Sequence, residues 1–172
     1  AQAHAAAYGK GPEAPLLIIA PRHPERGPEL AGALAAEGWA ITRRAAGDPL
    51  SGDIHIADTL GEMGLWYRLA PVAFVAGSLA NKGGHNPWEP AALGCAILHG
   101  PHVSNFAQAY ARLHAAGGAC QAQTPDGIAA ALTSLADPAR RAAQTAAARA
   151  ALAQSGATAT IATALLAALP GR

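Results

Sequence analysis

Residues 72–99 read VAFVAGSLANKGGHNPWEPAALGCAILH, and this stretch decides the fold that the sequence predicts. Its two short apolar runs, 72–75 and 96–99, have the length and composition of strands buried on both faces. Between them lie a glycine-rich turn and a predicted helix over residues 87–93, which Gly94 ends. A strand, a helix and a second strand in this order predict two neighbouring parallel strands.

The same alternation continues in both directions along the chain. Further strands are expected at residues 16–20, 40–42, 54–57 and 118–121, and further helices at 29–37, 61–69, 105–115, 126–135 and 138–169, the last broken near Ser155-Gly156. The chain also opens as though in the middle of a helix. We therefore predict the α/β class, with a Rossmann-like parallel sheet covered by helices on both faces, in a single domain over residues 1–172.

The composition limits the classes of function. Of the 172 residues 51% are apolar, many of them alanine, and this favours helices that pack through small contact faces. Charged residues make up 13% with a net charge of +1, which argues against a nucleic-acid partner, since such proteins concentrate basic residues on one face. No run reaches the roughly 18 strongly apolar residues that span a bilayer, so the chain itself is expected to be soluble.

Cysteine and histidine usage gives no sign of a metal centre. Cys95 and Cys120 form no CxxC pair, which favours a reducing cytoplasmic setting over a disulfide framework. The spacing of His85, His99 and His102 matches no standard zinc pattern, so no metal is expected.

The turn before residues 87–93 admits two interpretations. Asn86 is a strong N-cap residue, Pro87 suits the first helical position, and Glu89 lies where a capping box places its acid. Alternatively, the glycine turn and helix start bind a phosphate while Glu89 accepts hydrogen bonds from a ribose. The pattern alone leaves these balanced. Trp88 is either a packing residue or part of a base pocket.

Other unusual loops also follow predicted strands. Pro21 and Arg22 follow the first strand, where a guanidinium can fork onto phosphate or carboxylate. In Asp58-Thr59-Leu60-Gly61-Glu62 either acid could cap the next helix, or Gly61 could expose backbone to a ligand while Glu62 accepts a hydrogen bond. In parallel sheets ligands bind at the carboxyl ends of strands. The loops at 21–26, 58–62, 77–89 and 99–106 therefore predict a binding crevice.

Five motifs in register are specific enough to indicate a family. From residue 16 onward the chain resembles the C-terminal domain of the 3-deoxy-D-manno-octulosonic acid (Kdo) transferases of lipopolysaccharide synthesis. The resemblance rests on residues 17–26, 58–63, 77–78, 83–92, and 100–102 with Asn105-Phe106. The chain departs from the family at Ala76 (usually glycine), Leu60 (often methionine) and Trp88 (often leucine).

The resemblance implies half of a GT-B glycosyltransferase, whose two Rossmann-like domains enclose the active site. This half would bind the donor CMP-Kdo without a metal or other cofactor. The acceptor domain, with the catalytic glutamate, is absent from this chain, so no catalytic residue is expected here. The family's CMP contacts carry over to Pro21, Arg22, Leu60, Gly61, Glu62, Asn86, Pro87, Trp88 and Glu89.

The implied reaction is inverting transfer of Kdo to a lipid A precursor. Arg22 and the helix start near Asn86 would stabilise the charge on the departing CMP phosphate, while Glu62 and Glu89 hold the nucleoside. The full protein would lie against the cytoplasmic face of the inner membrane and meet its lipid acceptor through the N-terminal domain. The chain alone is expected to be inactive. The alternatives are another GT-B enzyme, either a UDP-sugar transferase or an epimerase, and a non-catalytic nucleotide-binding module.

Overall fold

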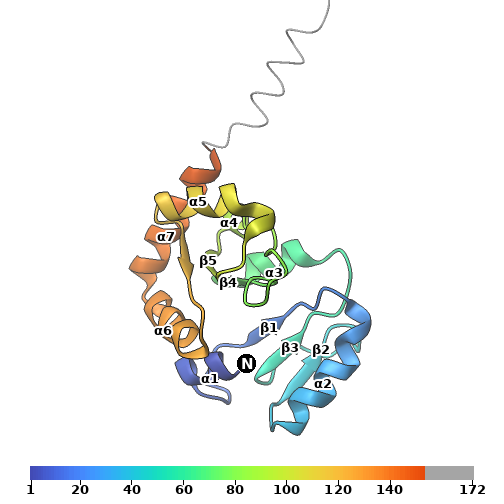
Figure 1. Ribbon diagram of the computed structural model, residues 1–172. Helices are drawn as coiled ribbons and strands as arrows, with labels where there is room; N and C mark the ends of the chain where they lie inside the picture. Colours follow the sequence, from blue (N-terminus) through green and yellow to red (C-terminus); the bar gives the residue numbers. More distant parts are fainter. Residues whose placement is uncertain (154–172) are drawn as a thin grey trace, which may run out of the picture.

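The computed structural model describes residues 1–153 (Figure 1). The part of the predicted last helix beyond residue 153, including its predicted break at Ser155-Gly156, lies outside the described residues.

The strands are parallel and form two sheets of three strands each. The first sheet has the order β1-β3-β2, made of β1 (Leu17–Ile19), β3 (Ile54–Ile56) and β2 (Ile41–Arg43). The second has the order β4-β5-β6, made of β4 (Val72–Val75), β5 (Ala96–His99) and β6 (Ala119–Gln121). The central strands β3 and β5 are buried along their whole length, as expected for apolar runs covered on both faces. The predicted α/β class is confirmed, with the parallel pairing divided between two sheets rather than running through one.

Helices occupy the intervals that the sequence predicts, with shifts of at most two residues at their described ends. The helices are α1 (Gln2–Tyr8), α2 (Gly27–Ala36), α3 (Met63–Leu69), α4 (Trp88–Leu93), α5 (Ala107–Ala115), α6 (Pro125–Ala136) and α7 (Pro138–Ala153). Short 3-10 turns, η1 (Pro24–Arg26) and η2 (Ser104–Phe106), precede α2 and α5. The predicted helix start at residue 105 is therefore a 3-10 turn, and the α-helix begins at Ala107.

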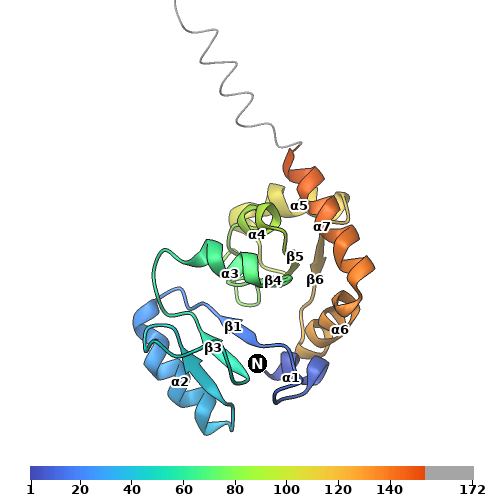
Figure 2. The same cartoon turned by 180° about the vertical axis from the view of Figure 1, so that it is seen from behind.

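The first sheet packs against α2. Its core contains Trp39, Ile54 and Ile56, against which Leu30 and Leu34 of α2 pack. The opening helix α1 packs against α6, far along the chain, and the Tyr8 hydroxyl donates to the Leu132 carbonyl of α6 (2.9 Å; Figure 2). The first helix therefore packs against a helix that lies more than a hundred residues later in the chain.

The second sheet has a core of small side chains. Ile97 and Leu113 lie in this core with Ala148 and Ala151 of α7. A Cβ on Gly118 would lie 2.7 Å from Ala148 Cα, so α7 crosses close to the start of β6. The abundant alanine thus provides the small contact faces that the composition predicts. None of the helices within residues 1–153 is both long enough and apolar enough to cross a bilayer.

Candidate functional site

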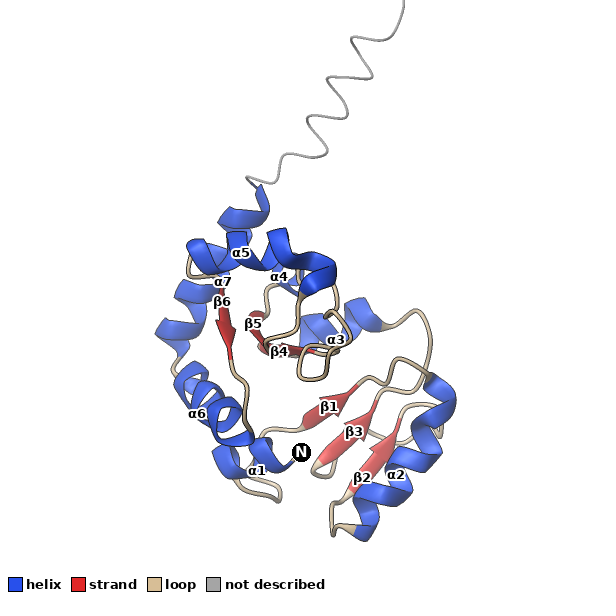
Figure 3. Cartoon of the chain, in the orientation of Figure 1, coloured by secondary structure: helices blue, strands red, loops and turns tan. Residues whose placement is uncertain are grey.

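The predicted site residues follow the carboxyl ends of β1, β3 and β4 (Figure 3). Those up to Pro87 lie in loops, and Trp88 and Glu89 begin α4. Hydrogen bonds and ion pairs join the loops within each sheet. Those after β2 and β3 meet through Arg44 and Glu62, and those after β4 and β5 meet through Gly83 and Asn105. Within residues 1–153, no hydrogen bond or ion pair links Arg22 to the residues from Gly83 to Glu89.

Asp58 is a buried anchor rather than a helix cap. Its side chain is fully buried, and it accepts hydrogen bonds from Arg43 Nε (2.9 Å), Arg43 Nη2 (2.6 Å) and the Ala45 N–H (2.8 Å). Burial raises the pKa of this carboxyl, but the hydrogen bonds and the Arg43 charge outweigh burial and hold the pKa below its ordinary value. A Cβ on Gly27 would lie 2.0 Å from Asp58 Oδ2, so only glycine fits there at the start of α2. The ion pair between Arg43 and Asp58 joins the ends of β2 and β3.

Glu62 is held by Arg44 in a two-point ion pair. Arg44 Nε donates to Oε2 (3.0 Å) and Nη2 to Oε1 (2.7 Å), and the Thr59 hydroxyl also donates to Oε2. The Arg44 guanidinium and the Thr59 hydroxyl lower the pKa of Glu62 to about 2. Because Arg44 already takes both oxygens, a ribose hydroxyl can reach Glu62 only through the remaining lone pairs. Gly61 beside it has a positive φ of 81°, and Leu60 is 83% exposed.

Arg22 is a free cation at the end of β1. Its side chain is exposed, and within the described chain it makes no hydrogen bond or ion pair. Pro21 beside it is half-buried, and η1 begins two residues later at Pro24. The guanidinium therefore remains available to an anion, as the sequence predicts.

The glycine turn after β4 is fixed by its neighbours. Gly83 and Gly84 have positive φ values of 82° and 70°, as expected from the two-glycine pattern. The Asn105 N–H donates to the Gly83 carbonyl (2.9 Å), and a Cβ on Gly83 would lie 2.4 Å from Asn105 Cγ. The loops after β4 and β5 are therefore interlocked at this point.

The start of α4 decides between the two interpretations of its N-terminal residues. Asn86 Oδ1 accepts a hydrogen bond from the Trp88 N–H (3.0 Å), but the N-cap position falls on Pro87, so Asn86 acts from one residue before the cap and is not the predicted N-cap. The helix begins at Trp88, one residue later than predicted, and this makes Glu89 its second residue rather than its third. Glu89 is exposed and makes no hydrogen bond within residues 1–153, so the capping box does not form. Its carboxylate is left free.

The helix start also offers less to a phosphate than the sequence predicts. The Trp88 N–H is taken by Asn86, Pro90 has no N–H, and α4 has only six residues. Among the first three residues of α4 only the Glu89 N–H lacks a partner within the described chain. Of the two groups that the sequence proposes for an anion, Arg22 therefore keeps more of its hydrogen-bond donors unused within the described residues.

Two residues, Tyr110 and Ser78, support the site through contacts that the sequence does not predict. The Tyr110 hydroxyl of α5 donates to the His85 carbonyl (3.0 Å), and this hydrogen bond fixes the glycine turn to α5. The Ser78 hydroxyl donates to the Val75 carbonyl (2.6 Å) and accepts from the Gly100 N–H (2.8 Å), joining the ends of β4 and β5. The Tyr110–His85 and Ser78–Gly100 contacts join residues 25 and 22 positions apart, so no local pattern indicates them.

His99 and Cys95 are buried, and their contacts within the described residues are those of packing residues. His99 is buried, with Nδ1 2.6 Å from the Gly100 carbonyl and Nε2 2.8 Å from His114 Nε2. Cys95 is buried, and burial raises the pKa of its thiol to about 11, so it is a poor nucleophile. Within residues 1–153 no three His, Cys, Asp or Glu side chains come together as metal ligands would.

Comparisons with known proteins agree with this geometry. The chain is 46% identical over 155 residues to the 3-deoxy-D-manno-octulosonic acid transferase of Bordetella pertussis, covering 87% of this chain and 35% of that protein. It is 36% identical over 114 residues to the protein of the same name from Haemophilus influenzae, covering 65% of this chain and 26% of that protein. The chain thus spans about a third or less of the length of these curated relatives. No family model matches the chain.

A solved structure is similar over most of its length. It is the C-terminal CMP-Kdo binding domain of WaaA from Acinetobacter baumannii, with a TM-score of 0.75 and 33% identity, over 80% of this chain and 73% of that one. The fold, the strand-end loops and these similarities define a glycosyltransferase domain. The chain belongs to the 3-deoxy-D-manno-octulosonic acid (Kdo) transferase family, within which it corresponds to the C-terminal domain.

Proposed function

We propose that this chain binds the donor CMP-Kdo, as the donor half of a transferase that moves Kdo with inversion to a lipid A precursor. The observation that carries the proposal is the likeness to a solved CMP-Kdo binding domain, at 33% identity over 80% of the chain. Arg22, in the loop after β1, and Glu89, at the start of α4, support the proposal. Neither side chain makes a hydrogen bond or ion pair within residues 1–153, and both follow the carboxyl ends of strands, where such folds bind ligands.

The proposed contacts divide by charge. Arg22 pairs with the CMP phosphate and stabilises the negative charge that grows on it as the sugar leaves. The Glu89 carboxylate accepts hydrogen bonds from the ribose hydroxyls. Glu62, already paired with Arg44, helps to shape the nucleoside pocket with Leu60 and Gly61. Pro21, Asn86, Pro87 and Trp88 complete the proposed contact set.

The catalytic base, in this proposal, belongs to an N-terminal acceptor domain. The chain alone then transfers no sugar, and the whole protein works at the cytoplasmic face of the inner membrane, where its lipid acceptor is. No metal or other cofactor takes part. Sugar transfer catalysed by the purified 172-residue chain would contradict this assignment of the base.

Calorimetric titration with CMP, UMP and UDP tests the donor. The proposal requires CMP to bind most tightly, and a preference for UMP or UDP would instead indicate a UDP-sugar enzyme. The Glu89→Ala variant should bind CMP at least about tenfold more weakly, the loss expected for a charge-assisted hydrogen bond. Its melting temperature should stay close to that of the parent, because Glu89 is exposed and makes no hydrogen bond or ion pair within residues 1–153.

Glu13→Ala is the matched control, since Glu13 is an exposed acid in the loop before β1 with no hydrogen bond or ion pair in the described chain. If Glu89→Ala binds CMP as tightly as Glu13→Ala does, Glu89 has no part in ribose binding.

A further inference from the structure

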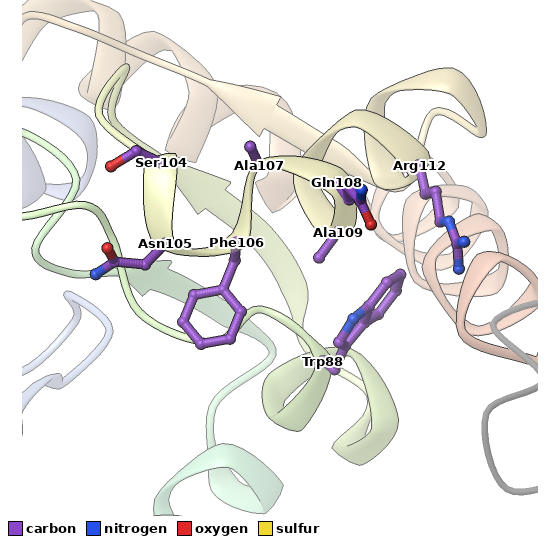
Figure 4. A pocket seen from close by; sticks show the side chains of 8 residues that line it. All are labelled: Trp88, Ser104, Asn105, Phe106, Ala107, Gln108, Ala109 and Arg112. Carbon is purple, nitrogen blue, oxygen red and sulfur yellow. The ribbon is translucent and has the colours of Figure 1, made fainter. Parts of the chain in front are cut away.

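A hollow of about 380 Å³ lies between the start of α4 and the face of η2 and α5 (Figure 4). Trp88 of α4 and Phe106 of η2 supply aromatic surface to it, and Gln108 and Arg112 of α5 supply polar groups. Its volume falls in the range of roughly 300–1,000 Å³ typical of small-molecule sites. We call it the Trp88–Arg112 hollow.

The polar side chains of the hollow are free. Arg112 and Gln108 are exposed, and their side chains make no hydrogen bond or ion pair within residues 1–153. No acidic residue lines the hollow. Its charge is therefore that of one unpaired guanidinium, which matches a ligand that carries a carboxylate or a phosphate.

The aromatic side chains select the shape of the ligand. Trp88 and Phe106 pack against the core of the second sheet, and both also line the hollow. In Figure 4 the Trp88 indole extends from α4 toward Gln108 and Arg112 of α5. Flat aromatic surface buries the apolar C–H face of a sugar ring, while the guanidinium pairs with an acid group on the same ring.

The hollow shares Trp88 with the proposed nucleotide site. Trp88 directly precedes Glu89, and Asn105, which also lines the hollow, interlocks with Gly83 of the glycine turn. A ligand that places its nucleotide on the loops can therefore extend into the hollow along α4. A nucleotide-activated sugar acid has this two-part shape.

We infer that the Trp88–Arg112 hollow is the subsite for the sugar acid of the donor, in which Arg112 pairs with the carboxylate and Trp88 covers the ring. The inference rests on the proposed donor, but it assigns residues that the nucleotide contacts do not include. Arg112, Gln108 and Phe106 are binding residues for the transferred group alone. They take no part in holding CMP.

Calorimetry on Arg112→Gln separates the two parts of the donor. The variant should bind CMP as the parent does and should bind CMP-Kdo about tenfold more weakly, the effect of one lost charge-assisted contact. Arg149→Gln is the control, because Arg149 is an exposed arginine of α7 that is also free within the described residues. Equal losses for CMP and CMP-Kdo, or no loss for either, would overturn the inference.

A second measurement does not depend on the nucleotide. Of the three tryptophans, Trp39 and Trp66 are 6% and 4% exposed, whereas Trp88 is half-buried, so the indole N–H signal of Trp88 reports on the hollow. Free Kdo should shift this signal, and a neutral sugar of similar size should not. If free Kdo leaves the Trp88 signal unchanged, or if the neutral sugar shifts it equally, the inference is overturned. If the parent chain fails to bind CMP, the proposed function is contradicted. The titration with free Kdo then still tests whether the Trp88–Arg112 hollow binds the sugar acid.

Discussion

Removing Arg43 should destabilise the fold far more than its position near the surface indicates. Its partner Asp58 is fully buried and is enclosed by Gly27, while Arg43 itself is 26% exposed. In Arg43→Ala the carboxylate would lose both guanidinium hydrogen bonds and keep, among the described residues, backbone N–H groups such as that of Ala45 at 2.8 Å. Breaking a buried ion pair by deleting one partner costs about 3–5 kcal/mol, because the remaining charge is left desolvated. That is a large part of a typical domain stability of about 5–15 kcal/mol.

Urea denaturation followed by circular dichroism measures this cost. The midpoint should fall while the denaturant slope stays constant, since the surface exposed on unfolding does not change. Arg26→Ala is the matched control, because Arg26 pairs with Glu29 across a surface where the two side chains are 55% and 67% exposed. Such exposed pairs contribute about 0–1 kcal/mol. Arg43→Ala and Arg26→Ala variants of equal stability would refute the reasoning. Adding Asp58→Asn to Arg43→Ala should recover part of the loss, because no buried charge then remains.

Two titrations test the other charged groups. The pKa of Glu62, about 2 in the parent, should rise in Arg44→Ala toward its ordinary value near 4.3, as measured by carboxyl NMR; a value still close to 2 would exclude Arg44 as the main cause. Burial lowers the pKa of His55 and of His99, so below about pH 6.5 the unfolded chain binds protons that the folded chain does not. The free energy of unfolding should therefore decrease as the pH is lowered below about 6.5, by up to about 1.4 kcal/mol per pH unit for each of these histidines. A urea midpoint that does not change between pH 7 and 5.5 would contradict their burial.

Local patterns predicted the elements of this fold well. The strands at 72–75 and 96–99 have the predicted bounds, because an apolar run between glycine or proline residues is a property of the segment itself. The division into two sheets was not predictable, since the pairing of a strand edge depends on how distant segments dock. The sequence shows two adjacent arginines at 43–44. It does not predict that Arg43 pairs with Asp58, because this contact also depends on how separate segments dock.

The α4 start shows how a one-residue shift changes a functional prediction. The sequence places Glu89 three residues after its cap at Asn86, but the helix begins at Trp88, and the carboxylate stays free. The local pattern thus correctly placed a hydrogen bond from Asn86 at the helix start, but it was wrong about the N-cap position, which is Pro87, and about the capping box. Leaving the acid unpaired within residues 1–153 is what makes it available to a ligand.

The interlock of Gly83 with Asn105 has an evolutionary consequence. A Cβ at position 83 would lie 2.4 Å from the side chain of Asn105, in a backbone region that favours glycine. A single substitution at position 83 therefore meets both a steric and a conformational barrier, and a smaller residue at position 105 removes only the first. The turn can diverge among relatives only by concerted change in two loops, so mutation is expected to alter ligand preference through the walls around the turn before it alters the turn itself.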